Sequence, residues 1–96
     1  MIATGKVLCC ELHTGRYFEC DIESLRRAEN KVNQRLIGEM YCTLTEFYWE
    51  VDLPVTSQSS EIGWEAGRPL KLEFSTVLTK DGKPCLTFEY NYTKLL

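Results

Sequence analysis

The sequence predicts an α+β domain in which one helix packs on a five-stranded, mostly antiparallel sheet, in the order β-β-α-β-β-β. Over much of the chain, apolar residues alternate with polar ones, which is the period of a strand with one buried face. One stretch instead repeats apolar residues every three or four positions, as an amphipathic helix does. The length of 96 residues suits a single domain, residues 1–96.

The first two strands are predicted to form a hairpin. One face would carry the apolar side chains of both strands: Leu8, Cys10, Leu12, Phe18, Cys20 and Ile22. A three-residue loop, His13-Thr14-Gly15, matches these faces, because it pairs Cys10 with Phe18.

The helix follows between Asp21 and Gly38. Asp21 or Ser24 can accept hydrogen bonds from the free amides of its first turn, and Gly38 can close its end. Its buried stripe is narrow and consists of Leu25, Ala28, Val32 and Leu36.

Residues 46–53 are predicted to form the third strand. Phe47, Trp49, Val51 and Leu53 alternate there with Glu46, Tyr48, Glu50 and Asp52, and Pro54 ends the run. Residues 55–69 have no clear period, so we expect a long loop anchored by Ile62 or Trp64.

The last two strands are predicted as a second hairpin, with the loop Lys80-Asp81-Gly82. A three-residue loop with Gly82 in the left-handed conformation places Phe74 opposite Phe88 and Leu72 opposite Tyr90. The same register extends to Leu70 and Tyr92. A two-residue loop would instead place apolar residues opposite polar ones.

The cysteines indicate a reducing compartment. Their number is odd, five, and they show neither Cys-x-x-Cys pairs nor zinc-ligand spacing. Since the chain opens on Met without a secretory signal, we expect a cytoplasmic protein of bacterial type with reduced thiols and no cofactor. Cys10 and Cys20 are expected to face the core, and Cys9 to face outward and react faster.

Charge and hydropathy limit the partners. The net charge of −3 and the isoelectric point near 5.1 argue against a general nucleic-acid or anionic-membrane binder. The longest apolar run, residues 7–10, is too short for a membrane segment.

Candidate site residues are few, and no catalytic or cofactor signature is present. The candidate binding residues are Trp64, Tyr48, Tyr90, Tyr92, Arg27, Lys31 and Arg35. Trp64 can be a core plug or a contact residue, since both uses are common for tryptophan in a loop. The three basic residues recur every four positions on the helix, which suits a phosphate backbone, an acidic protein or simply a solvated face.

Two further groups allow more than one interpretation. Glu46, Glu50 and Asp52 would share one strand face, either as paired carboxylates or as a solvated acidic row. His13 is the only histidine, and its place in a hairpin loop favours an exposed side chain without a catalytic role.

The predicted function rests on the widths of the sheet and the helix, because one helix is too narrow to cover the apolar face of five strands. A five-stranded sheet is about 24 Å wide, whereas one helix is about 10 Å across. We therefore expect a non-enzymatic binding or interaction protein that forms a homodimer through Tyr90 or Tyr92, or that meets another protein partner. The alternative is a small-molecule-binding or hydrolytic domain with an apolar pocket between helix and sheet, gated by the loop around Trp64.

Overall fold

The computed structural model describes residues 6–95, which form a mixed α+β fold with two helices and two sheets. The α+β class is confirmed, whereas the five-stranded sheet with a single helix is wrong. The elements in chain order are β1 (Val7–Glu11), β2 (Arg16–Cys20), α1 (Ile22–Glu39), β3 (Tyr41–Thr43), α2 (Leu44–Val51), β4 (Ile62–Glu65), β5 (Leu72–Leu78), β6 (Pro84–Tyr90) and β7 (Thr93–Lys94).

The strands divide into a four-stranded sheet in the order β2-β1-β6-β5 and a three-stranded sheet in the order β3-β4-β7. The β1 and β6 strands are parallel, and all other pairs are antiparallel. Two local features separate the sheets. The expected long loop contains β4, and the last predicted strand breaks after Tyr90, so that β7 pairs with β4.

The predicted third strand is a helix, α2. Its start carries a capping box, in which the backbone N–H of Thr43 donates to Glu46 Oε2 over 3.0 Å. Leu44, Phe47, Tyr48 and Val51 are buried at helical spacing, whereas Trp49 is 66% exposed. The strand prediction failed because eight alternating residues also place a set of apolar side chains on one helix face.

The one helix predicted from the sequence is confirmed as α1. The Asp21 carboxylate accepts the N–H of Ser24 over 2.7 Å, and the buried stripe is the expected one. The helix ends later than expected, because Met40 takes the left-handed conformation (φ 72°) and its N–H donates to Leu36 O.

The register of the first hairpin is shifted by one residue from the prediction. Cys9, not Cys10, pairs with Phe18, and Glu11 pairs with Arg16 across a four-residue loop. Glu11 closes that loop, because its carbonyl oxygen accepts the N–H of Gly15 over 2.8 Å. Cys9 and Glu11 consequently face the core, and the expected outward Cys9 is wrong, since its exposed fraction is zero.

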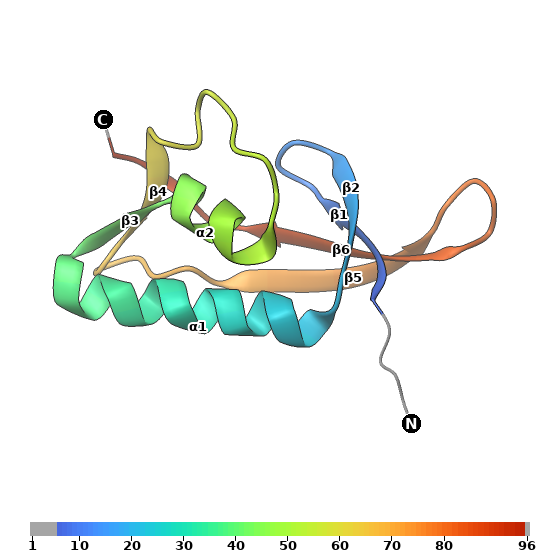
Figure 1. Cartoon of the computed structure of the whole chain (residues 1–96), viewed down its shortest axis with the longest axis horizontal. Coiled ribbons are helices and arrows are strands. Elements are labelled where there is room, and N and C mark those ends of the chain that lie inside the picture. Colours follow the sequence, from blue (N-terminus) through green and yellow to red (C-terminus); the bar gives the residue numbers. More distant parts are fainter. Residues whose placement is uncertain (1–5, 96) are drawn as a thin grey trace.

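The second hairpin has the predicted register. Leu72 pairs with Tyr90 and Phe74 with Phe88, and Gly82 has a φ of 77°. Leu70 lies before β5 and is outside the ladder. Figure 1 shows α1 running alongside β5, with α2 next to α1, and the β5–β6 loop extending beyond the N-terminal end of α1.

Candidate functional site

Glu11 is fully buried, and its carboxylate lies in the core between the first hairpin and α2. Its Oε2 accepts the hydroxyl of Tyr48 over 2.7 Å and also the hydroxyl of Tyr90. Its Oε1 accepts the backbone N–H of Thr14 over 2.7 Å and the Thr14 hydroxyl. Two of the candidate tyrosines therefore converge on a residue that sequence reasoning missed.

The electrostatics of this cluster keep the proton on the tyrosines. Burial by itself would raise the pKa of Glu11, but hydrogen bonds from Thr14, Tyr90 and Tyr48 outweigh it and hold the pKa below the ordinary value. Burial raises the pKa of both Tyr48 and Tyr90. Four donors saturate the carboxylate, so it has no free position for a substrate and acts as a structural centre.

The surface beside this cluster carries His13 and Tyr92. Their rings meet edge to face with centroids 4.8 Å apart, and Tyr92 is 49% exposed. A hollow of about 320 Å³ lies next to them, lined by His13, Gln58, Glu61, Ile62, Tyr92 and Lys94. This hollow is a surface depression that carries charged groups of both signs, Glu61 and Lys94. The pocket expected from the sequence was instead apolar and lay between helix and sheet.

Side chains of the core occupy the space between the helices and the sheet. Trp64 is fully buried, packs edge to face on Phe47 and donates its indole N–H to Asn91 O. Phe47 in turn packs on Phe88 of β6. Trp64 therefore takes the plug position of the two that the sequence allowed.

Two of the three basic candidate residues on α1 are paired with carboxylates of α2. Lys31 Nζ lies 3.5 Å from Glu50, and Arg35 forms an ion pair with Glu46. Because residues 46–51 are helical, the expected acidic strand face does not exist, and two of its carboxylates turn toward α1. Arg27 remains exposed near the start of α1.

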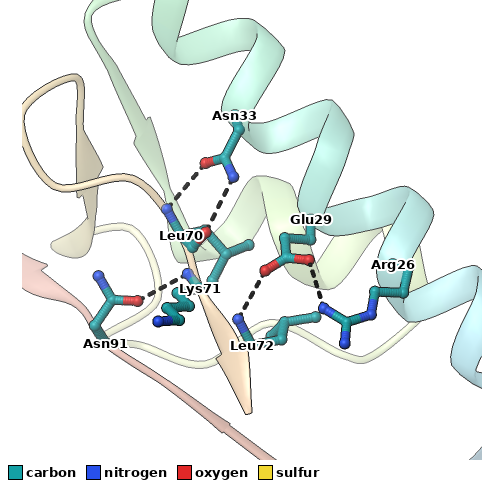
Figure 2. Close-up of polar contacts among 7 residues, drawn as sticks. All are labelled: Arg26, Glu29, Asn33, Leu70, Lys71, Leu72 and Asn91. Carbon is teal, nitrogen blue, oxygen red and sulfur yellow. Dashed lines mark hydrogen bonds and ion pairs between the residues drawn. The ribbon is translucent and has the colours of Figure 1, made fainter.

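Side chains of α1 hydrogen-bond the outer edge of the chain where it enters β5 (Figure 2). Asn33 Nδ2 donates to Leu70 O over 3.0 Å, and the Leu70 N–H donates to Asn33 Oδ1 over 2.9 Å. One turn earlier on α1, Glu29 Oε2 accepts the N–H of Leu72 over 2.8 Å. These side chains occupy positions at which a neighbouring strand would otherwise bind.

The same segment is held from its inner side by Asn91. Asn91 Oδ1 accepts the N–H of Lys71 over 2.9 Å, and its Nδ2 donates to Pro69 O over 2.9 Å. Farther along β5, the guanidinium of Arg26 lies 4.6 Å from the centre of the Phe74 ring. Protection by α1 therefore covers only the first part of β5.

Within residues 6–95, no strand or helix covers the outer edge of the second part of β5. The Leu72 N–H points to α1, and the Thr79 N–H points inward to Lys83 O. Because backbone groups alternate along a strand, those of Thr76 and Leu78 point outward. We call the outer backbone edge of residues 76–78 the open edge. Its Val77 and Leu78 side chains are 46% and 71% exposed.

A model described as a family of unknown function (DUF6353) matches residues 1–96. The chain belongs to the DUF6353 family. No curated protein and no solved structure matches it.

In this DUF6353 chain, residues 6–95 contain no group of three or more histidine, cysteine or acidic side chains placed to hold a metal ion. Neither described helix is long and apolar enough to cross a membrane. Sequence reasoning also missed Asn33 and Glu29, which looked like ordinary solvated helix residues. The sequence did carry a signal for the open edge. Residues 74–79, Phe-Ser-Thr-Val-Leu-Thr, contain no charge, which is unusual for an exposed strand edge.

Proposed function

We propose that this protein is a small, non-enzymatic interaction protein that works as a homodimer. The observation that carries the proposal is the open edge of β5. Exposed strand edges are ready to pair with another chain, and proteins normally guard them with charges, proline or covering elements. Here α1 guards the edge at Leu70 and Leu72 but leaves residues 76–78 free.

The polar centre of the fold supports a binding role over a catalytic one. The Glu11 carboxylate is fully buried and already accepts four hydrogen bonds. A general base must instead reach the proton that it abstracts. The carboxylates of α2 are paired with Lys31 and Arg35, so they too serve the packing of the two helices.

The proposed interface differs from the one expected from sequence. Tyr90 uses its hydroxyl inside the protein, on Glu11, and Tyr92 packs against His13. The core face of the large sheet packs on α2, where Phe47 lies against Phe88, so we take the open edge as the surface that a partner covers. A closed two-fold pair is the commonest way to satisfy such a surface.

We also assign the protein to the cytoplasm. All five cysteines are free and buried, although Cys9 and Cys20 lie close enough for a thiol–carbonyl contact of 3.6 Å. Thiols that remain unpaired suit a reducing compartment.

Sedimentation velocity from micromolar to millimolar concentration tests the proposal. We expect the mass to rise with concentration from 11.1 kDa toward twice that value. A single 11.1 kDa species at every concentration contradicts the proposed homodimer.

A further inference from the structure

We infer that two copies of this chain pair their open edges antiparallel about a two-fold axis at Val77, joining their large sheets into one continuous sheet. This inference rests on the proposed homodimer and specifies its interface. The occupant of the open edge is thus the same segment of a second copy.

The register follows from which backbone groups are free. The edge at Leu70 and Leu72 is occupied by Asn33 and Glu29, and the guanidinium of Arg26 lies on Phe74. Thr76 and Leu78 are the outward-facing residues of β5 beyond Phe74, and no described contact of α1 reaches them. An antiparallel arrangement that uses both residues sets Thr76 opposite Leu78 of the partner subunit. Each such pair exchanges two hydrogen bonds, so the two-fold axis generates four.

The side chains near the axis suit this arrangement. Val77 meets the partner's Val77 on one face of the joined sheet, and both are about half exposed in the single chain. On the other face, the 71% exposed Leu78 lies beside the partner's Thr76. Residues 76–78, which form the ladder, carry no charge, so the ladder itself brings no like charges together.

Charge complementarity at the ends of the interface favours a second copy over an unrelated strand. Continuing this register past Leu78 brings the hairpin turn of the partner subunit, with the partner's Lys80, toward Phe74. Phe74 contacts Arg26, and Glu23 lies three residues earlier on the same face of α1. Glu23 is exposed, whereas Arg26 is already paired with Glu29 at 3.2 Å. The partner's Lys80 therefore meets an available carboxylate, and the symmetry repeats this contact.

The interface is small, so the dimer is expected to be weak. Three residues per copy enter the ladder, and interfaces below about 1,200 Å² are typical of transient complexes. This size predicts a monomer–dimer equilibrium over the concentration range tested.

The test compares dissociation constants of full-length variants by sedimentation velocity. Leu78→Lys adds a charge at the open edge, and we expect it to raise the dissociation constant about tenfold or more, like Thr76→Lys. Leu12→Lys is the matched control, because Leu12 is a 47% exposed leucine in the β1–β2 loop, and we expect no change. Circular dichroism verifies that each variant is folded.

A charge swap tests the register. We expect Lys80→Glu to weaken the dimer several-fold, and Glu23→Lys combined with Lys80→Glu to restore it, because both contacts then form with reversed signs. If the Leu78→Lys and Thr76→Lys variants dimerise as well as the wild-type protein, the edge pairing is wrong and the homodimer still stands. A charge swap that restores nothing overturns the register. A monomeric wild-type protein refutes the homodimer and the interface together.

Discussion

The side-chain amide of Asn33 makes both hydrogen bonds that a neighbouring strand would make to Leu70. Its Nδ2 donates to Leu70 O over 3.0 Å, and its Oδ1 accepts the Leu70 N–H over 2.9 Å. A helix side chain thus replaces a strand at the start of β5. The last of these hydrogen bonds is made to Leu72, the Arg26 guanidinium lies over the Phe74 ring, and the open edge begins at Thr76.

Asn33→Ala removes both bonds and leaves the backbone groups of Leu70 unpaired. Because Leu70 is buried, we expect a loss of about 1–3 kcal/mol in the free energy of unfolding. Urea denaturation measures it. Asn30→Ala, on the exposed side of the same helix, is the control and should stay within about 0.5 kcal/mol of the wild type. Equal stabilities of the two variants would show that the amide contributes nothing.

Glu11→Gln tests the buried carboxylate. The amide NH₂ would face hydroxyl and N–H donors, so we expect a loss of about 1–3 kcal/mol at neutral pH. The folded-state pKa of Glu11 lies below its ordinary value of 4.5, so the carboxylate stabilises the fold above that pH. This stabilisation disappears as the pH falls through the folded-state pKa.

Thermal unfolding of both proteins against pH measures this effect. The difference in melting temperature between wild type and Glu11→Gln should be largest near neutral pH and shrink in acid. A difference that is constant with pH would contradict the role assigned to the ionised carboxylate.

The thiols are expected to be inert in the folded protein. Burial raises the pKa of Cys42 to about 12 and that of Cys9 to about 11, and the reactive species is the thiolate. Labelling with a thiol reagent should be slow at all five cysteines without denaturant and fast in urea. Rapid labelling of Cys9 in the native protein would contradict the observed register of β1.

Gly82→Ala tests the turn of the β5–β6 hairpin. Gly82 has a φ of 77°, so a Cβ costs about 1 kcal/mol or more through the left-handed penalty. Gly38→Ala, inside α1 and with open space around its Cβ, should instead stabilise the protein by about 0.5–1 kcal/mol. Chemical denaturation of both variants checks the opposite signs, and destabilisation by both would count against the turn geometry.

The elements predicted correctly are those with a long, unambiguous period and a decisive end. The stripe from Leu25 to Leu36 and the pairing of Phe74 with Phe88 are of this kind. Residues 46–51 were misassigned because the alternation over residues 46–53 fits two periods, although the capping box from Thr43 to Glu46 marks a helix start.

The first hairpin and the candidate site depended on tertiary contacts that sequence patterns do not reveal. An apolar face was expected to exclude Glu11, yet Tyr48 and Tyr90, both distant in sequence, supply the donors that allow its burial. The tyrosines could be selected as candidates but not placed, since their meeting point is set by α2. The same holds for Asn33, whose partner lies 37 residues away.

Amide hydrogen exchange at several protein concentrations tests the open edge most directly. In the single chain, no described residue pairs with the amides of Thr76 and Leu78, whereas the Val77 amide faces β6 within the hairpin. Pairing with a second copy predicts that exchange at Thr76 and Leu78 slows as concentration rises, while exchange at Val77 changes little. Exchange rates at Thr76 and Leu78 that stay fast and independent of concentration would contradict the pairing.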